Sequence, residues 1–290
     1  MSARIIEAAD GTRLSVRDSG ERDRVALLLA DGIGCDGYIW KYVRAAFEGE
    51  FRIVHLHHRG HGSSDVPRDL STLTVGQLAD DLWWVLDALE IGRAVLWGHS
   101  MGVQVTLEAA SRRPERTIAL LPTCGAFERP LQTFRDNDFA AKVLPLVQRA
   151  VTGSGSRLRR IWKHVVPTDL AYWIAVATEI NGRLIQRGDF LPYLDHLADM
   201  DPEVFVTLLG SVADHSVRGV LPTLTMPSLV FAGSNDNFTP ARLAHELAEL
   251  LPDAELCIVP GGTHTAPLEI PDLVTLRARR FFAAHAIGVN

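Results

Sequence analysis

The run Gly98-His99-Ser100-Met101-Gly102 places a serine between two glycines, directly after the apolar residues 94–97. A helical pattern follows, so we expect Ser100 on a tight turn between a strand and a helix. A strained turn of this kind lifts a serine hydroxyl clear of the sheet, where it can act as a nucleophile. The positive N-terminal end of the helix would stabilise negative charge that develops there. A serine that only caps a helix is the alternative.

A nucleophilic serine needs a base, and the base needs an acid that orients it. Two downstream side chains are candidates, because Asp236 follows the apolar stretch 228–232 and His264 follows the stretch 255–259. We expect both in loops at the carboxyl ends of strands, where open α/β sheets place their ligands. An Asx-turn aspartate and an ordinary loop histidine are the alternatives.

The elements that must position these side chains alternate along the chain. Short apolar stretches alternate with helical periodicity, which is typical of βαβ units and a mostly parallel sheet. The expected strands are an antiparallel hairpin of 2–8 and 12–18, then 25–30, 51–56, 94–97, 117–122, 228–232 and 255–259. The expected helices are 74–90, 100–113, 240–251 and 270–285. Continuous apolar strands predict a sheet covered on both faces.

Residues 128–222 interrupt this alternation. Apolar side chains recur there at helical spacing, first in Phe139, Val143, Leu146 and Ala150, and later in Phe205, Leu208, Leu209 and Val212. We therefore predict a helical insertion of about ninety residues between two parts of a core, since helices favour such spacing.

Composition limits the class of protein. The chain has 290 residues, 47% of them hydrophobic, and a net charge of −6 with both signs mixed, which argues against nucleic-acid binding. Its cysteines are too few and too scattered for a disulfide framework or a zinc site: Cys35, Cys124 and Cys257. No secretory segment and no membrane-spanning run is apparent, so we expect a cytoplasmic protein. Assembly into a homo-oligomer stays open.

Two further motifs lie near the end of the chain. The first matches G-x-x-D-x-x-x-P at Gly233, Asp236 and Pro240. The second matches H-x-x-x-x-E-x-P at His264, Glu269 and Pro271. With the serine motif, they make the chain resemble an α/β-hydrolase over essentially its whole length.

The resemblance implies a fold and a set of roles. It implies a mostly parallel, eight-stranded sheet flanked by helices, with a helical cap at 128–222 inserted after the sixth strand and a core at 1–127 and 223–290. Ser100 would be the nucleophile, His264 the general base, and Asp236 the acid that holds the imidazole tautomer. Aromatic residues of the cap are candidate linings of the substrate pocket: Phe134, Phe139, Trp162, Tyr172, Trp173, Phe190, Tyr193 and Phe205.

The loop after the strand at 25–30 reads Asp31-Gly32-Ile33-Gly34. In the family this loop carries a His-Gly pair, and the next residue donates a backbone N–H to the oxyanion. We therefore predict an oxyanion hole formed by the amides of Ile33 and Met101, with Gly32 and Gly34 giving the backbone room to approach a substrate. Supporting roles are expected for Gly98, His99 and Gly102. An ordinary surface turn is the alternative.

Two residues depart from the family pattern. Asp31 stands where histidine is usual, and His57, in a segment that resembles D-x-R-G-x-G-x-S, stands where aspartate is usual. Our hypothesis is that Asp31 and His57 are hydrogen-bond partners that have exchanged positions, so that a buried polar pair stays satisfied. Independent drift of the two positions is the alternative. No metal site is expected among His55, His57, His58 and His61, because no acidic or cysteine ligand accompanies them at suitable spacing.

These residues predict hydrolysis of a carboxylic ester, thioester or lactone through an acyl-enzyme, without a cofactor. The substrate would be small and apolar or aromatic. One alternative is a hydrolase of the same family that cleaves a carbon–carbon bond beside a ketone. Another is a small-ligand receptor derived from a hydrolase, since some receptors keep a complete triad.

Overall fold

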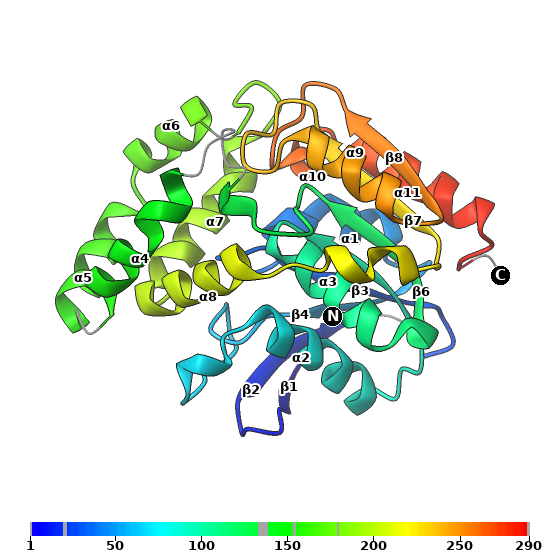
Figure 1. Cartoon of the computed structure of the whole chain (residues 1–290), viewed down its shortest axis with the longest axis horizontal. Coiled ribbons are helices and arrows are strands. Elements are labelled where there is room, and N and C mark those ends of the chain that lie inside the picture. Colours follow the sequence, from blue (N-terminus) through cyan, green and yellow to red (C-terminus); the bar gives the residue numbers. More distant parts are fainter. Residues whose placement is uncertain (1, 20–21, 133–138, 153–154, 179, 289–290) are drawn as a thin grey trace.

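An eight-stranded sheet forms the centre of the molecule. The structure, a computed structural model, describes residues 2–19, 22–132, 139–152, 155–178 and 180–288. The strands are β1 (Ser2–Glu7), β2 (Arg13–Asp18), β3 (Ala26–Ala30), β4 (Arg52–Leu56), β5 (Ala94–His99), β6 (Thr117–Thr123), β7 (Ser228–Gly233) and β8 (Ala254–Val259). Their order in the sheet is β1-β2-β4-β3-β5-β6-β7-β8 (Figure 1). The pairs β1–β2 and β2–β4 are antiparallel, whereas all later neighbours are parallel.

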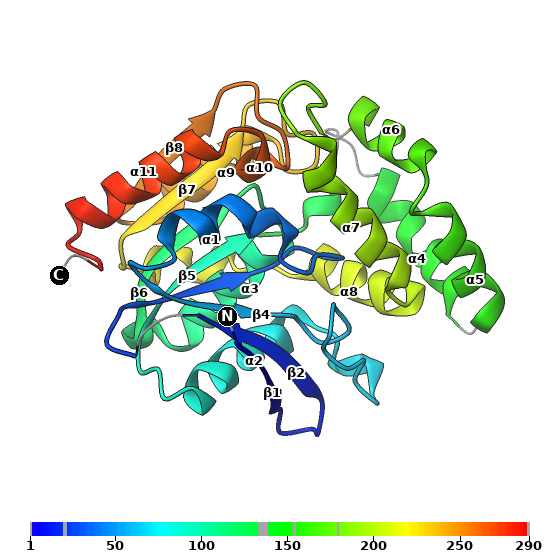
Figure 2. The same cartoon turned by 180° about the vertical axis from the view of Figure 1, so that it is seen from behind.

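Helices cover both faces of the sheet because its central strands are apolar on both sides. In β3, Leu28 packs into one core and Leu27 and Leu29 into the other, since successive side chains of a strand point to opposite faces. The helices on the first face are α2 (Val75–Ala88), α3 (Met101–Arg112) and α9 (Ala241–Leu250). Those on the second are α1 (Lys41–Phe47) and α11 (Pro271–Ala284) (Figure 2). The covered, mostly parallel sheet predicted from the sequence is confirmed.

Between β6 and β7 the chain leaves the sheet and forms a helical cap. Its helices are α4 (Phe139–Val151), α5 (Gly155–Val165), α6 (Asp169–Thr178), α7 (Arg187–Asp199) and α8 (Pro202–Asp214). They gather at one end of the sheet (Figures 1 and 2), where α7 packs on the short 3₁₀ helix η1 (Tyr38–Trp40) and α8 packs on α2. The predicted insertion after the sixth strand is confirmed, whereas the domain boundaries at residues 127/128 and 222/223 stay a prediction.

The sequence pattern anticipates the long elements but not the short helix α1. The four helices expected in the core correspond to α2, α3, α9 and α11, each shorter by one or two residues at either end. Helix α1 has seven residues and buries only Val43 and Phe47, too few apolar repeats to show a helical period. Within the described ranges, no helix has the length and hydrophobicity needed to cross a bilayer.

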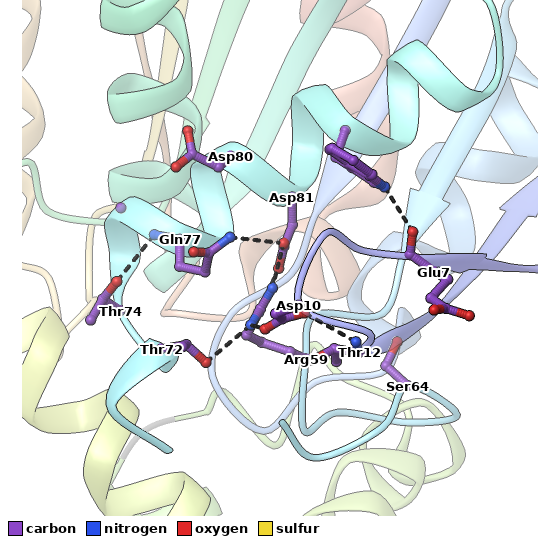
Figure 3. A network of polar contacts seen from close by, with 12 residues as sticks. Glu7, Asp10, Thr12, Arg59, Ser64, Thr72, Thr74, Gln77, Asp80 and Asp81 are labelled. Atoms are coloured by element: carbon purple, nitrogen blue, oxygen red, sulfur yellow. Dashed lines mark hydrogen bonds and ion pairs between the residues drawn. The ribbon is translucent and has the colours of Figure 1, made fainter. Parts of the chain in front are cut away.

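A fully buried arginine ties the loop after β4 to three other segments of the chain (Figure 3). The Arg59 guanidinium donates to both carboxylate oxygens of Asp81 on α2, over 2.7 and 2.6 Å. It also donates to Asp10 in the β1–β2 hairpin over 2.8 Å and to the Thr72 hydroxyl over 3.0 Å. Two parallel hydrogen bonds to one carboxylate fix the plane of a guanidinium. The loop after β4, which approaches the candidate site, is thereby anchored.

We expect Asp81→Ala to lower the free energy of unfolding by about 3 kcal/mol, because it removes one partner of a buried ion pair. Asp80→Ala is the matched control on the same helix. Asp80 pairs with Arg112 at the surface, where its side chain is 56% exposed, and such a pair contributes about 0–1 kcal/mol. Urea unfolding followed by circular dichroism measures both losses, and equal losses would contradict the expectation.

Candidate active site

Ser100 occupies a strained turn between β5 and α3. β5 ends at His99, α3 begins at Met101, and Ser100 between them has φ 55° and ψ −118°. A positive φ is uncommon for a residue with a Cβ and persists where the surrounding structure imposes it. Gly102 lets α3 begin against β3, because a Cβ at that position would lie 2.2 Å from the Ala30 carbonyl oxygen. The strand–turn–helix arrangement expected around the serine is therefore observed.

His264 lies between the serine and an aspartate. The Ser100 hydroxyl donates to His264 Nε2 over 2.9 Å, and His264 Nδ1–H donates to Asp236 Oδ2 over 2.9 Å. An ionised carboxylate only accepts, so Nδ1 carries the proton and Nε2 turns its lone pair toward the serine. The structure thus brings together the three side chains singled out from the sequence, in the tautomer that activation of a serine requires.

The Asp236 carboxylate is buried and accepts four hydrogen bonds. Its Oδ1 accepts hydrogen bonds from the backbone amides of Phe238 and Thr239, each over 2.8 Å. Its Oδ2 accepts the Thr239 hydroxyl over 2.8 Å in addition to His264. Asp236 is therefore both an Asx-turn residue and the partner of the imidazole, and the turn fixes the carboxylate that orients His264. Thr239 is a contributor that the sequence patterns do not indicate.

A second buried carboxylate, Glu269, holds the loop that carries His264. It accepts the Thr263 amide and the Thr263 hydroxyl, each over 2.6 Å, and the Thr265 hydroxyl over 3.1 Å. It also accepts the backbone amide of Asn181 from the cap over 2.7 Å. The residues on both sides of His264 are thereby fixed. The motif H-x-x-x-x-E-x-P contains Glu269, but no sequence signal indicates Asn181.

His99, the residue before the serine, supports the same loop. Its Nε2–H donates to the backbone carbonyl of His264 over 2.9 Å, because a carbonyl oxygen can only accept. His99 is 1% exposed, so this bond forms in a site shielded from water.

The two amides expected to form an oxyanion hole lie beside the serine. Gly32 is so close that a Cβ there would be 2.9 Å from Ser100 Cβ, and Ile33 follows it in the turn. Met101 is the first residue of α3, whose N-terminal amides point at the turn. In the described part of the chain, neither Ile33 nor Met101 donates its amide to a protein acceptor. The oxyanion hole predicted at these two N–H groups therefore stays a prediction.

The hypothesis that Asp31 pairs with His57 is wrong. Asp31, fully buried, accepts His55 Nε2–H over 2.8 Å and the indole Nε1–H of Trp40 over 2.7 Å. β4 ends at Leu56, so His57 has already left the strand, and its Nδ1 accepts the Ser63 amide over 2.9 Å. His55, still in β4 beside the strand that Asp31 follows, is therefore the residue that meets the carboxylate.

Four histidines near the site are buried, and burial favours their neutral form. Burial lowers the pKa of His57, His58 and His99 to about 4 and that of His61 to about 3. The pKa of Asp31 is about 2: burial would raise it, but the charge and hydrogen bond of His55 outweigh burial. Across the described residues, no three His, Cys, Asp or Glu side chains are grouped as metal ligands.

A cavity of about 330 Å³ opens onto the serine and the imidazole. Its walls come from the core and the cap, and among the residues that the structure describes, none that lines it is Lys, Arg, Asp or Glu. The lining consists of Ile33, Cys35, Tyr38, His99, Ser100, Met101, Gln104, Ala126, Pro130, Leu131, Ala175, Ile180, Phe190, Tyr193, Phe205, Leu209, Val212, Phe238, Thr239, His264 and Thr265. A pocket of this kind selects an uncharged, largely apolar ligand.

Three of the aromatic residues expected to line the pocket do so: Phe190, Tyr193 and Phe205. Trp162, Tyr172 and Trp173 are not part of the lining. Trp162 instead donates its indole N–H to the Leu197 carbonyl over 2.7 Å. Phe134 lies outside the described residues, as does the side chain of Phe139. The core contributes Tyr38 and Phe238, which are not among the linings expected from the sequence.

Comparisons with known proteins agree with this architecture. Residues 25–161 match the family model described as alpha/beta hydrolase fold, and residues 211–275 match one described as TAP-like protein. The chain is 27% identical to a putative carbamate hydrolase RutD from Caulobacter sp. (strain K31), over 96% of this chain and 97% of the relative. It is 25% identical to 3-oxoadipate enol-lactonase 1 from Acinetobacter baylyi, over 81% and 80% of the two chains. A thermophilic esterase from Thermogutta terrifontis superposes with a TM-score of 0.76, at 23% identity, over 98% of this chain and 99% of that one.

We expect the free energy of unfolding to fall as the pH falls from about 6.5 to 5. In the unfolded chain each imidazole binds a proton near its ordinary pKa of about 6.5, whereas the pKa of His57, His58 and His99 in the folded chain is about 4. Their contribution is therefore complete above pH 6.5 and is lost toward pH 4, at up to about 1.4 kcal/mol per pH unit for each imidazole.

Urea titrations at a series of pH values measure this slope. His58→Phe removes one buried imidazole and should make the slope shallower by about one proton. His245→Phe, on the exposed side of α9, is the control and should keep the wild-type slope. A slope that is unchanged in His58→Phe would show that this buried imidazole does not contribute.

Proposed function

The chain belongs to the α/β-hydrolase superfamily, and on that premise we propose that it is a serine hydrolase that cleaves carboxylic esters or lactones through an acyl-enzyme. The observation that carries the proposal is the hydrogen-bonded series Ser100–His264–Asp236 at an uncharged cavity. A serine hydroxyl with an imidazole lone pair at 2.9 Å is positioned to lose its proton as it attacks an acyl carbon.

In the first half-reaction, Ser100 Oγ attacks the carbonyl carbon and its proton passes to His264 Nε2. The carbonyl oxygen becomes an oxyanion and accepts hydrogen bonds from the backbone amides of Ile33 and Met101. The bond to the leaving alcohol then breaks, and that alcohol takes the proton from His264. Asp236 stays ionised and stabilises the imidazolium through Nδ1–H. The product of this half is an ester between the acyl group and Ser100.

In the second half-reaction, water gives a proton to His264 and attacks the acyl carbon. The bond to Ser100 Oγ breaks, the serine recovers its proton from His264, and the carboxylic acid leaves. With a lactone, the alcohol stays attached to the acyl group, so a single hydroxy acid is released at this stage. The same residues perform both halves because His264 alternates between base and acid.

The cavity supports a small, uncharged substrate. Its volume of about 330 Å³ is near the lower end of the ~300–1,000 Å³ range of ligand pockets. In the part of the chain that the structure describes, no cationic side chain lines it, so a charged acyl group would lose its hydration there without gaining a partner. The relative named an enol-lactonase favours a lactone, and the relative named a carbamate hydrolase makes a carbamate the next candidate.

We expect Ser100→Ala to lower kcat by about 10⁴–10⁶-fold, because the acyl-enzyme can no longer form. A fluorophosphonate probe should label the wild-type protein at Ser100, and His264→Ala should suppress labelling. Ser111→Ala is the control, since Ser111 lies further along α3 outside the cavity lining. Mass spectrometry locates the adduct. Full labelling of His264→Ala would show that the base is misassigned.

A substrate panel separates the proposed reaction from its alternatives. We expect turnover of a neutral aryl ester and a simple lactone, weaker turnover of an aryl carbamate, and little of a vinylogous diketone. Preferred cleavage of the diketone would favour carbon–carbon hydrolysis. Tight binding of these compounds without turnover, unaffected by Ser100→Ala, would favour a receptor. The measurement is product release by liquid chromatography.

A further inference from the structure

His61 lies beneath the turn that carries the proposed oxyanion donor. The backbone amide of Gly34 donates to His61 Nε2 over 3.0 Å. On the other side of the ring, Nδ1–H donates to the Arg59 carbonyl over 3.2 Å. A carbonyl oxygen can only accept, so the proton is on Nδ1 and Nε2 is an acceptor. The two contacts agree on one neutral tautomer.

The residue that supplies this carbonyl is itself immobilised. The Arg59 guanidinium is bound by Asp81 and Asp10 (Figure 3), and the whole residue is buried. His61 is 1% exposed. Because Arg59 is held in place, its carbonyl fixes the orientation of the His61 ring. The ring in turn restricts the Gly34 amide that donates to it.

The turn above the ring is narrow. The Cys35 amide donates to the Gly32 carbonyl over 3.2 Å, which closes a four-residue turn with Ile33 and Gly34 at its centre. Gly34 has φ +72°, a conformation that glycine adopts at the third position of such turns. Each peptide unit is planar, so the Gly32 carbonyl, which accepts the Cys35 amide, lies in one plane with the Ile33 N–H, and the bond from the Gly34 amide to His61 fixes the next peptide plane. Together the two hydrogen bonds restrict the orientation of the Ile33 amide, which lacks a protein acceptor in the described chain.

The cap closes the other side of this turn. A Cβ on Gly34 would lie 3.0 Å from Leu197 Cδ1 and 3.4 Å from Tyr193 Cε2, both on α7. On the same helix, His196 lies over the His61 ring with centroids 6.2 Å apart, and its Nε2 accepts the Gly62 amide over 3.2 Å. The turn is thus held between His61 and α7, and the His61 ring is held by hydrogen bonds at both of its nitrogens.

From this arrangement we infer that His61 is a positioning residue, whose Nε2 holds the Gly34 amide and thereby aims the Ile33 amide at the substrate oxyanion. The inference rests on the proposed serine-hydrolase function, and it assigns to a histidine outside the triad a specific part in the reaction. Burial keeps the pKa of His61 at about 3, so Nε2 remains an acceptor at any pH at which the protein would act.

The test compares three variants in the full chain. His61→Phe keeps a buried ring but removes the acceptor, and we expect kcat for an aryl ester to fall about 10–100-fold with KM changed less than about twofold. Complete loss of one oxyanion donor costs about 10²–10³ in kcat, which sets the upper limit. His61→Gln offers a carboxamide oxygen in place of Nε2 and should restore at least about a third of the lost log kcat.

His58→Phe is the matched control. His58 is equally buried in the same loop, but within the described chain no hydrogen bond joins either of its ring nitrogens to residues 32–35 of the turn. We expect its kcat to stay within about twofold of wild type. An equal fall of kcat in His58→Phe and His61→Phe, or no rescue by His61→Gln, would overturn the inference in favour of simple packing.

Amide hydrogen exchange at Gly34 gives a readout that does not depend on turnover. We expect exchange to be at least about tenfold faster in His61→Phe, close to wild type in His61→Gln, and unchanged in His58→Phe. Faster exchange without a fall in kcat would overturn the positioning role while leaving the proposed function intact. Absence of turnover and of Ser100 labelling in the wild-type protein would instead overturn the proposed function itself.

Discussion

The candidate site depends on one hydrogen bond between residues that are 164 positions apart, Ser100 and His264. Its length of 2.9 Å leaves little freedom, since such bonds weaken steeply with distance and angle. The parallel sheet makes this contact possible. β5, β7 and β8 run in the same direction, so the loops that follow them emerge at one edge and can meet there. An antiparallel β8 would have placed His264 at the opposite edge, and the serine would have had no base.

Buried carboxylates fix the loops at that edge. Asp31, Asp236 and Glu269 are each almost fully buried, and an isolated buried charge is costly. Each is instead surrounded by donors: an imidazole and an indole at Asp31, two amides, a hydroxyl and an imidazole at Asp236, and amides and hydroxyls at Glu269. Since the donors to each carboxylate come from separate segments of the chain, satisfying each charge also sets the relative positions of those segments.

The cap covers the candidate site and also supports two loops of the core. Asn181 donates to the carboxylate that holds the His264 loop, and Leu197 and Tyr193 pack against Gly34 in the oxyanion turn. The helix that lines the pocket with Phe190 and Tyr193 is therefore the one that borders the proposed oxyanion donor. A displacement of α7 would change the shape of the pocket and the support of the turn together, because both use the same side chains.

Local pattern was enough to predict the strands, the long helices and the triad candidates, since strand periodicity, glycine spacing and the position of a residue after a strand are properties of short segments. The predicted catalytic roles of Ser100, Asp236 and His264 are what the resemblance to the α/β-hydrolases implies for these residues. The partner of Asp31 could not be found in this way. His55, His57, His58 and His61 are near neighbours in the chain, and the end of β4 and the packing of Trp40 decide which ring meets the carboxylate.

The residues that line the pocket could not be predicted from the sequence either, because a helical period identifies apolar residues but not the element that each one faces. Trp162 binds a backbone carbonyl of α7 while Phe205 reaches the cavity, and only the packing of one helix on another makes that choice.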